Sequence, residues 1–432
     1  MDMASETGSR EWTSPFRPAT SSRPKWCIDM GCCFSEPVDF DGEVTLFHFD
    51  LLRAIGRGAF GKVRVVEHKR SKKLYALKYI DKSQCIRDKA VAHIIQERRL
   101  LEEIDHPFVV NLRYAFQDDL NCFFVMDLML GGDLRFHMNS QRHIPEEAIV
   151  FWIAELSCAL DYLHRQRIIH RDLKPDNILL DEKGHVHITD FNVAIHCSQT
   201  RLHTSVAGSL AYMAPEVVGR KGYNWTVDWW SLGITAYELL FRKRPFDGRT
   251  GEKMTYSILN DPLKFPDDRQ CSKAALSVVR GFIDRDVSTR LGCRPDGDGF
   301  DDIRDHAWFS SINWDALEAK KSKPPFVPDM TRANFDVSHE LDEFLVVEKP
   351  LTHKKRKPNP DLEKMKPGFG QLEKYFTVYD FSKSQRMSYY PHNQAIGTES
   401  TNTDQTCVQA SSDTIIPTAT IAERSQGGLI YI

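Results

Sequence analysis

The sequence of 432 residues has no run of eighteen consecutive apolar residues, so it predicts no membrane-spanning helix. Its first residues also lack the apolar stretch of a secretory signal peptide. The formal net charge of −3 gives no overall reason to expect nucleic-acid binding. Together these absences predict a cytoplasmic protein without a nucleic-acid partner.

Ten cysteines are scattered along the chain without a CxxC pair or the spacing of a zinc finger. Irregular spacing in a chain of this length is typical of a reduced protein and not of one that disulfides hold together. Hydrophobic residues make up 41% of the sequence and charged residues 27%, which are ordinary values for a globular protein. A hydrophobic core of normal size can therefore form.

Composition divides the chain into four parts. Residues 1–48 are rich in Ser, Thr, Pro and Arg and show no sustained hydrophobic periodicity, so we predict that they are disordered. Residues 49–309 carry strand and helix patterns and form the expected folded domain. Residues 310–390 form an expected tail that is Pro-rich and partly charged, and the polar residues 391–432 are again predicted to be disordered.

The expected domain changes character near the segment "LGGDL". Before it, the patterns predict short strands in "FDLLRAIG", "GKVRVVEH" and "KLYALKYI", and one amphipathic helix in "DKAVAHIIQERRLLEEI". After it, the patterns are mostly helical, as in "PEEAIVFWIAELSCALDYLHRQ" and "VDWWSLGITAYELLF". The sequence thus predicts an α+β protein with a small β-rich lobe, which contains one main helix, and a larger α-rich lobe.

A glycine-rich segment, "GRGAFGKV", has the pattern GxGxxGxV and lies between two predicted strands. A dinucleotide-binding fold has a similar spacing but places the glycines before a helix, so this context favours a flexible loop over a triphosphate. Lys78 lies on the next predicted strand and Glu97 inside the amphipathic helix. Taken alone, each of these two charges is more often an exposed surface residue.

Three further motifs follow in the second lobe. "IIHRDLKPDNILL" contains Asp172, Lys174 and Asn177 between two apolar runs, "TDFN" contains Asp190, and "MAPE" ends at Glu216. In this order and spacing, the motifs resemble those of the eukaryotic protein kinases from residue 49 to about residue 309. The resemblance implies the bilobal protein kinase fold and transfer of the ATP γ-phosphate to a protein hydroxyl with Mg²⁺, for which Mn²⁺ is a candidate substitute.

By that resemblance, Lys78 would hold the α- and β-phosphates of ATP and pair with Glu97. Asn177 and Asp190 would bind Mg²⁺, which prefers oxygen ligands. Asp172 would orient the substrate hydroxyl, and Lys174 would neutralise charge on the moving phosphoryl group. The expected ATP-binding residues around the glycine-rich loop, the gatekeeper and the hinge are Ile55, Gly56, Arg57, Gly58, Ala59, Phe60, Gly61, Val63, Ala76, Lys78, Glu97, Met126, Asp127, Met129 and Asp133.

"HRDLKPDN" is the form that serine/threonine kinases carry, and Ser209 falls where they keep a hydroxyl near the catalytic base. "HPFVVNL", "LGGDL" and "TRLGC" resemble the AGC group of kinases, and "HVHITDFN" resembles its YANK subgroup, the serine/threonine kinase 32 type. In the tail, "YFTVYDF" is compatible with the hydrophobic motif of AGC kinases, with Asp380 in place of a phosphorylated hydroxyl. An accidental aromatic segment is the alternative.

Resemblance also assigns residues outside the catalytic centre. Ser205, with Thr204 beside it, aligns with the activation-loop phosphosite, where a phosphate would pair with Arg171. We expect a buried ion pair between Arg290 and Glu216. Three acids fall where basophilic relatives hold substrate arginines, so we expect basic protein substrates for a monomeric kinase; they are Asp133, Asp176 and Glu238. An unmodified hydroxyl and solvated surface acids are the alternatives.

The segment "MGCCFS", residues 30–35, fits the N-myristoylation pattern, and Cys32 and Cys33 beside Gly31 are available for palmitate. Acylation of Gly31 requires translation to start at Met30. One acyl chain holds a membrane weakly, whereas two anchor a protein stably. We therefore expect a cytoplasmic long form and a shorter form at the plasma membrane, with an equal alternative of two cysteines in a disordered segment.

Asn192 stands where most kinases carry the glycine of Asp-Phe-Gly. The protein is therefore either an active kinase with one substituted residue or a pseudokinase scaffold that binds ATP and partners without turnover. Pseudokinases usually lack at least one catalytic position, and all are present here, which favours the active kinase. Since Asn tolerates unusual φ angles well, we expect Asn192 to preserve Mg²⁺ binding and to stiffen the inward-to-outward movement of this segment.

Overall fold

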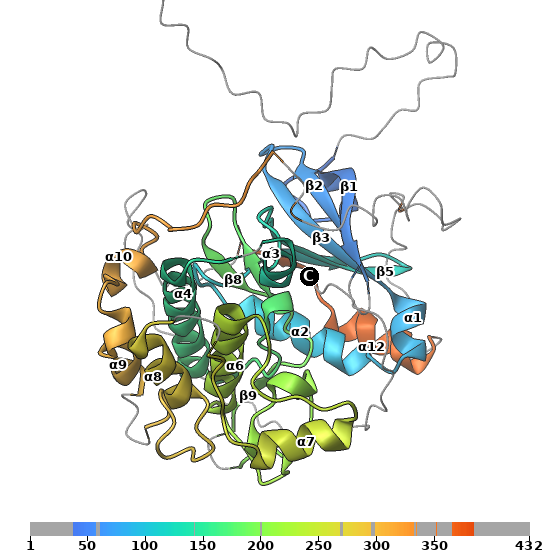
Figure 1. Ribbon diagram of the computed structural model, residues 1–432. Coiled ribbons are helices and arrows are strands. Elements are labelled where there is room, and N and C mark those ends of the chain that lie inside the picture. The colour runs from blue at the N-terminus through green and yellow to red at the C-terminus, as the bar shows by residue number, and fades with distance from the viewer. Residues whose placement is uncertain are drawn as a thin grey trace, which may run out of the picture.

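The structure is a computed structural model that describes residues 38–57, 61–141, 143–198, 201–267, 271–294, 299–331, 334, 351 and 365–383. It contains a small lobe built on a β-sheet and a larger helical lobe (Figure 1). This arrangement agrees with the predicted α+β architecture of a small β-rich lobe and a larger α-rich lobe. The proposed acylation residues Gly31, Cys32 and Cys33, and Gly58, Ala59 and Phe60 of the glycine-rich loop, lie outside the described residues, as do residues 1–37 and 391–432 of the predicted disordered ends. For residues 38–48 the prediction of disorder is wrong, because Val44 and Leu46 are buried in a core cluster with residues of the sheet.

An antiparallel sheet forms the small lobe, with the strand order β1-β2-β3-β5-β4-β10 in the described residues. A short 3-10 helix, η2 (Leu46–His48), precedes it. The first three strands match the predicted ones. Buried and partly exposed side chains alternate along most of β2, whereas β3 has four consecutive buried residues, as expected of a strand inside the sheet. The bounds of the strands are β1 (Phe49–Arg57), β2 (Lys62–His68), β3 (Leu74–Asp81), β4 (Leu112–Gln117) and β5 (Asn121–Asp127).

The small lobe contains two consecutive helices where the sequence predicted one. Helix α1 (Lys82–Arg87) starts at Asp81, whose carboxylate accepts a hydrogen bond from the backbone N–H of Gln84. Helix α2 (Val91–Glu103) follows after a break and presents its apolar face to the sheet. The prediction of one main helix is correct for α2, but the preceding turn of helix depends on a cap that the hydrophobic pattern does not reveal.

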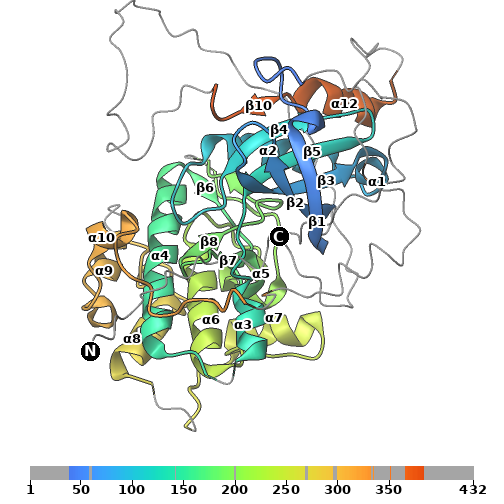
Figure 2. The same ribbon diagram turned by 90° about the horizontal axis from the view of Figure 1, so that it is seen from above.

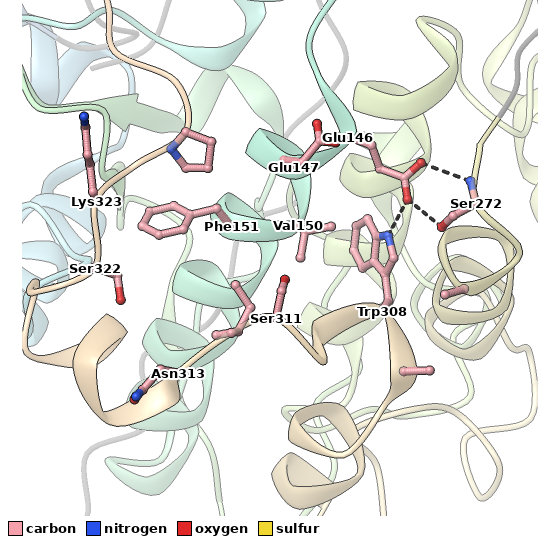
Figure 3. A pocket seen from close by; sticks show the side chains of 14 residues that line it. Glu146, Glu147, Val150, Phe151, Ser272, Trp308, Ser311, Asn313, Ser322 and Lys323 are labelled. Carbon is pink, nitrogen blue, oxygen red and sulfur yellow. Dashed lines mark hydrogen bonds between the residues drawn. The ribbon is translucent and has the colours of Figure 1, made fainter.

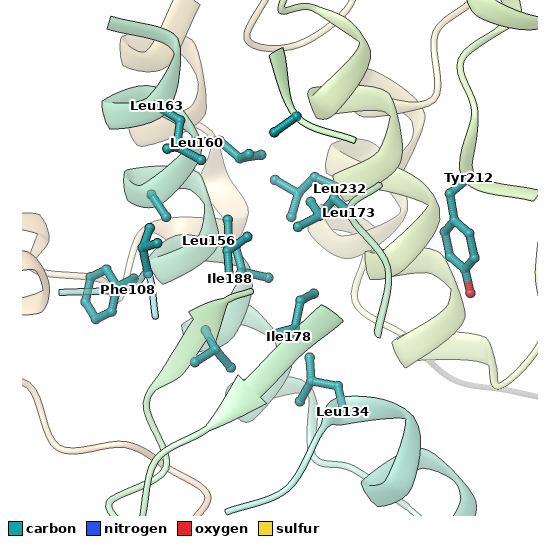
Figure 4. Close-up of a cluster of buried hydrophobic side chains, with 14 of the residues drawn as sticks. Phe108, Leu134, Leu156, Leu160, Leu163, Leu173, Ile178, Ile188, Tyr212 and Leu232 are labelled. Atoms are coloured by element: carbon teal, nitrogen blue, oxygen red, sulfur yellow. The ribbon is translucent and has the colours of Figure 1, made fainter. Parts of the chain in front are cut away.

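Two long helices form the centre of the large lobe. All fifteen residues of α6 (Val227–Phe241) are buried, and most of its side chains are apolar, as expected of a helix in the core of a lobe. Helix α4 (Glu146–Arg165) packs against it, and their leucines meet the strands β7 (Ile178–Leu180) and β8 (Val186–Ile188) in one core (Figure 4). Burial of each such side chain stabilises the fold by roughly 1.5–3 kcal/mol. The loop that contains Asp172 therefore packs on a stable part of the core.

Shorter elements surround these two helices (Figure 1). The two-residue strands β6 (Ile168–Ile169) and β9 (Ile195–His196) pair with each other. The remaining helices and 3-10 turns are α3 (Leu134–Ser140), η3 (Pro175–Asn177), η4 (Leu210–Tyr212), α5 (Pro215–Val218), α7 (Gly251–Asn260), α8 (Lys273–Phe282), α9 (Gly299–Arg304), η5 (Ala307–Phe309) and α10 (Trp314–Glu318). None of the helices in the described residues is long and apolar enough to cross a membrane.

The last described part of the tail returns to the small lobe. Helix α12 (Pro367–Tyr375) lies beside α1 and α2, and strand β10 (Tyr379–Asp380) extends the sheet next to β4 (Figures 1 and 2). Between them, Phe376 is fully buried, and its ring packs edge to face with that of Phe124, with the ring centroids 5.1 Å apart. This burial favours the hydrophobic-motif interpretation of "YFTVYDF" over an accidental aromatic segment.

Polar contacts fix the backbone of this docked tail. Arg98 Nε on α2 donates to the carbonyl of Thr377 at 2.8 Å, and Gln117 Nε2 on β4 donates to the carbonyl of Phe376 at 2.8 Å. Lys82 on α1 and Glu373 on α12 form a buried ion pair at 3.7 Å. These contacts hold the backbone at Phe376 and Thr377 against β4 and α2, and they place the Glu373 carboxylate beside the buried Lys82 ammonium group.

Two braces of the large lobe join segments far apart in the sequence. Arg290 donates two hydrogen bonds to Glu216, at 2.7 and 2.9 Å, which confirms the expected buried ion pair. Asp228 on α6 accepts hydrogen bonds at 2.9 Å from the backbone N–H groups of His170 and Arg171. The backbone just before Asp172 is therefore held from below by a buried carboxylate.

Candidate active site

Three charged side chains meet between the lobes. Lys78 Nζ on β3 lies 2.8 Å from Glu97 Oε1 on α2 and 3.9 Å from Asp190 Oδ1. No more than 6% of any of the three side chains is exposed. Burial alone would lower the pKa of Lys78, but the charges of the two carboxylates outweigh it and hold that pKa above its ordinary value. The lysine is thus a fixed positive charge in the cleft.

A second group of polar contacts gathers around Asp172. Lys174 Nζ donates to Asp172 Oδ2 at 2.8 Å and to Ser209 Oγ at 2.8 Å. Asn177 Nδ2 donates to Asp172 Oδ2 at 3.0 Å, and the Ser209 backbone N–H donates to Asp172 Oδ1 at 2.7 Å. The loop residues that the motif predicted therefore converge on one carboxylate, together with the serine of the downstream segment.

Gly208 makes the approach of Ser209 to Asp172 sterically feasible. Its φ of +105° lies in a region that residues with a side chain rarely adopt. A Cβ at this position would lie 2.2 Å from the carbonyl oxygen of Arg171, far inside van der Waals contact. The glycine of "AGSL" is therefore required for the backbone of the downstream segment to reach the catalytic loop.

Two buried oxygens in the cleft fit a metal ion. Asn177 Oδ1 and Asp190 Oδ1 are both inaccessible to solvent and accept no hydrogen bond. Such unsatisfied acceptors are uncommon in proteins, and hard cations prefer amide and carboxylate oxygens. Both atoms belong to the residues that resemblance assigned to Mg²⁺, so the donor set is suited to that ion.

The backbone around "DFN" differs from the expectation for Asn192. Asp190 has a φ of +65°, in the left-handed region, whereas Asn192 is not among the described residues with a positive φ. Phe191 is buried and its ring packs edge to face with that of His170, with the ring centroids 5.0 Å apart. The tolerance of Asn for positive φ is therefore not what this conformation uses, because the unusual backbone lies at Asp190 instead.

The expected ATP-binding residues at the edge of the small lobe form an apolar group. Ile55, Val63 and Ala76 are buried together, and Leu128 of the hinge packs against them. Sequence motifs did not identify Leu128, although its position between Asp127 and Met129 is a usable signal. Gly56 and Arg57 lie at the end of β1, paired with Val63 and Lys62 of β2. Gly61 is required because a Cβ there would lie 2.4 Å from the Tyr79 carbonyl oxygen.

The hinge is held by neighbouring strand β4. The gatekeeper Met126 is buried and pairs with Ala76 across the sheet, and Met129 is partly buried. The Asp127 N–H donates to the Asn111 carbonyl at 3.1 Å, so this N–H already has a partner. Arg113 donates two hydrogen bonds to the Asp127 carboxylate, a contact that the sequence did not predict.

Ser205 lies where the activation-loop phosphosite was predicted. Its hydroxyl accepts a hydrogen bond from Arg171 Nη1 at 2.9 Å, and Tyr223 donates to its backbone carbonyl at 2.7 Å. Ser205 and Thr204 are both exposed. A phosphate on Ser205 would therefore meet the guanidinium of Arg171, and Tyr223 is a neighbour that the motifs did not indicate.

The three acids expected to bind basic substrates have their own partners. Arg135 Nη1 donates to Glu238 Oε1 at 2.8 Å, and Arg135 Nε lies 3.3 Å from Asp176 Oδ2. Asp133 is buried and caps α3 by accepting a hydrogen bond from the backbone of Phe136 at 2.7 Å. Burial raises the pKa of Asp133 to about 6. Arg135, which the sequence reasoning did not single out, thus occupies two of the three carboxylates.

A separate pocket of about 630 Å³ lies on the large lobe, where the starts of α4 and α8 meet η5 and the first residues after α10 (Figure 3). Glu146 lines it and accepts hydrogen bonds from Ser272 Oγ at 2.6 Å and Trp308 Nε1 at 2.9 Å. No described residue that lines it belongs to the predicted ATP or catalytic set. The pocket is therefore distinct from the cleft between the lobes.

Comparison with known proteins identifies relatives for most of the chain. The family model described as "Protein kinase domain" matches residues 49–309. Human serine/threonine-protein kinase 32B is 43% identical over 329 residues, which cover 74% of this chain and 77% of the relative. Human serine/threonine-protein kinase 32C is 40% identical over 345 residues (77% and 70%), and serine/threonine-protein kinase Sgk1 of Fundulus heteroclitus is 42% identical over 300 residues (69% and 68%).

The geometry at Asn192 gives a first prediction. Asn192→Gly removes a buried amide oxygen that accepts no hydrogen bond and leaves Asp190 in place, so we expect phosphotransfer within roughly tenfold of the natural chain, about 1.4 kcal/mol of barrier. The measurement is kcat with a peptide substrate under saturating ATP. A gain much larger than tenfold would show instead that Asn192 inhibits the enzyme.

Proposed function

Since the chain belongs to the protein kinase family, as a serine/threonine kinase of the AGC group and its 32-type (YANK) subgroup, we propose roles for its residues in phosphoryl transfer from ATP. The protein transfers the γ-phosphate of ATP to serine or threonine hydroxyls of protein substrates. Like the family in general, it uses ATP with Mg²⁺. The alternative of a pseudokinase without turnover is not supported.

The observation that carries the assignment of roles is the convergence of hydrogen bonds on Asp172. Its carboxylate is oriented by Lys174 and Asn177, so it is held in one direction when a substrate hydroxyl approaches. We propose that Asp172 accepts the hydrogen bond of that hydroxyl and aligns it for attack. Lys174, whose ammonium group already bridges Asp172 and Ser209, would add positive charge where the phosphoryl group moves.

Nucleotide binding would use the other side of the cleft. Lys78, held by Glu97, is suited to the α- and β-phosphates, and the apolar group of Ile55, Val63 and Ala76 is suited to the adenine. Bound Mg²⁺ neutralises charge on the phosphates. Asn177 and Asp190 supply its protein oxygens, and because oxygen donors also suit Mn²⁺, we propose that Mn²⁺ can replace Mg²⁺.

Ser205 is the proposed activating phosphosite. In the present structure its uncharged hydroxyl accepts one hydrogen bond from the Arg171 guanidinium. A phosphate there would add negative charge and further acceptor oxygens, pair with the guanidinium and order the segment that ends at Gly208 and Ser209. The backbone N–H of Ser209 donates to the Asp172 carboxylate, so ordering of this segment would also fix the position of that carboxylate.

The proposed substrates are proteins with basic residues near the target hydroxyl. Glu238 and Asp176 supply the negative charge, but Arg135 neutralises part of it from within the chain. Only 25% of the Arg135 side chain is exposed, and its bonds to Glu238 measure 2.8 and 3.0 Å, so a substrate arginine must share these carboxylates with it. We therefore propose a moderate rather than a strict requirement for basic residues.

Two further proposals concern the state of the protein in the cell. We propose that it acts as a monomer, because the exposed large apolar side chains of the described residues occur singly along the chain. Light scattering on the purified protein would reveal a dimer.

We also propose a cytoplasmic long form and a membrane-associated form that begins at Met30. This second proposal depends on the residues of "MGCCFS" alone.

Asp172→Asn tests the catalytic assignment. The amide keeps the shape of the side chain but cannot accept the substrate proton, so we expect phosphate incorporation to fall by roughly 10²-fold or more. The assay compares phosphorylation of a peptide array by both proteins, with Mg²⁺ or Mn²⁺ as the metal. Asp315→Asn, which changes an exposed aspartate of α10, is the matched control and should retain full activity. Equal incorporation by the Asp172→Asn protein would contradict the assignment.

Arg135→Gln tests the proposed sharing of carboxylates. Removal of the internal guanidinium leaves Glu238 and Asp176 to a substrate arginine, so we expect the preference for arginine-containing peptides over matched glutamine peptides to rise roughly fivefold, by about 1 kcal/mol. The measurement is the ratio of kcat/KM values for the paired peptides. Arg135→Lys, which retains the positive charge, should change this ratio little. A fall in the ratio for Arg135→Gln would refute the proposal.

Lipid attachment has its own test. We expect intact mass spectrometry of the protein isolated from its native cells to detect a product that begins at Gly31 and carries a myristoyl group, with palmitate on Cys32 or Cys33. Gly31→Ala in a chain that starts at Met30 is the control and should abolish both acylation and membrane fractionation. Absence of any fatty acid on Gly31 in the native protein would remove the membrane-associated form.

A further inference from the structure

Phe381, at the end of the docked tail, lies against an arginine of strand β4. Its ring centroid is 5.2 Å from the guanidinium carbon of Arg113, which is cation–π distance. The Phe381 backbone N–H donates to the Arg113 carbonyl at 3.0 Å and so continues the pairing of β10 with β4 by one residue. The ring also meets Tyr114 edge to face at 5.4 Å. The position of Phe381 over Arg113 is therefore fixed by its backbone and by its ring.

The same guanidinium also binds the carboxylate of Asp127, at the start of the hinge. Arg113 Nε and Nη2 donate to the two carboxylate oxygens of Asp127 at 2.7 and 2.6 Å, which is the bidentate geometry of the strongest arginine–carboxylate pairs. Asn111, the residue before β4, adds a longer contact from its Nδ2 to Asp127 Oδ2 at 3.4 Å. Asp127 is the last residue of β5, so these contacts hold the start of the hinge.

Arg113 thus lies between the tail and the hinge. The ion pair is only about one-fifth exposed, with 22% of the Arg113 side chain and 20% of the Asp127 side chain accessible. Loss of Phe381 would uncover the guanidinium and let water compete for it, and the value of an ion pair falls steeply as it becomes exposed. Undocking of the tail would therefore loosen Asp127 without any change in the ATP-binding residues themselves.

We propose that Arg113 is a positioning residue through which the docked tail sets the affinity of the hinge for ATP. The proposal depends on the proposed binding of adenine at the apolar group of Ile55, Val63 and Ala76, against which Leu128 of the hinge packs. Because coupling between two sites is reciprocal, ATP should in turn hold the tail in its docked position. Docking of the tail and binding of ATP are then coupled, and the guanidinium of Arg113 is the group that couples them.

A purely structural role for Arg113 makes different predictions, and the chain offers a matched comparison. Arg99 on α2 also stacks on a tail aromatic ring, that of Tyr375, at 5.4 Å. Its guanidinium faces α12 and not the hinge, since Arg99 lies on the exposed side of α2. Loss of the Arg99 contact would free the Tyr375 ring at the end of α12 but would leave Phe381 in place over Arg113, so it would not release Asp127.

The test compares Arg113→Met, Phe381→Leu, the double variant and Arg99→Met in steady-state kinetics with the full chain. We expect Arg113→Met and Phe381→Leu each to raise the KM for ATP roughly fivefold, with kcat and the KM for peptide unchanged, in line with typical coupling between sites. The double variant should show no more than the larger single effect, because both changes break one path. Arg99→Met should leave the KM for ATP unchanged.

A second measurement covers variants that lose stability or activity. Hydrogen exchange of residues 367–383, with and without an unhydrolysed ATP analogue, reports docking directly and needs no turnover. The natural chain should show slower exchange in this segment when the analogue is bound, and Arg113→Met should show no such slowing. Unchanged KM for ATP in Arg113→Met, multiplicative effects in the double variant, or slowing that persists without Arg113 would each overturn the proposal. Natural protein without turnover would count against the proposed function, not against the coupling.

Discussion

The buried ion pair between Lys78 and Glu97 is the contact on which the arrangement of the cleft depends, because it exists only while α2 stays in place. Three consecutive residues of α2 hold that position. Gln96 donates to the Ala194 carbonyl in the segment after Asp190, Glu97 pairs with Lys78 of β3, and Arg98 donates to the tail. Successive residues on a helix point about 100° apart, so one turn can reach three separate segments. The activation segment, the sheet and the tail are therefore linked at a single turn of α2.

This arrangement is not the most stable one available to a buried site. Burial of two charges costs more in desolvation than an ion pair of ordinary geometry returns, and Glu97 Oε2 and Asp190 Oδ1 remain without hydrogen bonds. Unsatisfied buried acceptors cost roughly 1–3 kcal/mol each. The core under Asp172 offsets such costs, since α4 and α6 meet the catalytic loop with fully buried leucines (Figure 4). A rigid apolar base thus allows the cleft to keep buried acceptors without hydrogen bonds, among them the Asn177 and Asp190 oxygens that a metal ion would satisfy.

Sequence reasoning identified residues whose roles follow from short motifs and missed contacts between distant residues. Asp172, Lys174 and Asn177 lie within six positions, so their spacing alone limits how they can meet, and the structure brings them together. No local pattern shows that Arg135 will fill the acidic site with Glu238, or that Arg113 will lie under the tail. These contacts depend on tertiary packing and on strand register, which a single sequence does not reveal.

The same limit applies to element boundaries and to the tail. The sequence predicted one helix from residue 88, whereas Asp81 caps a separate helix before it. The aromatic segment "YFTVYDF" could be recognised as a candidate motif, but its docking depends on the pairing of Tyr379 with Ala115 of β4. The sequence shows that the tail segment is rich in aromatic side chains, but it does not show which strand of the sheet this segment pairs with. Prediction was therefore strongest for the catalytic loop and weakest where the tail meets the small lobe.

What holds the tail can be decided from magnitudes. Asp380 was expected to replace a phosphate, yet its carboxylate accepts hydrogen bonds from the backbone and hydroxyl of Ser382 and so serves the turn of the tail itself. An exposed charge contact would contribute at most about 1 kcal/mol, whereas burial of an aromatic side chain contributes roughly 1.5–3 kcal/mol. Phe376 and Tyr379 are both buried. Docking is therefore driven mainly by aromatic burial, and in this chain it needs no phosphate at position 380.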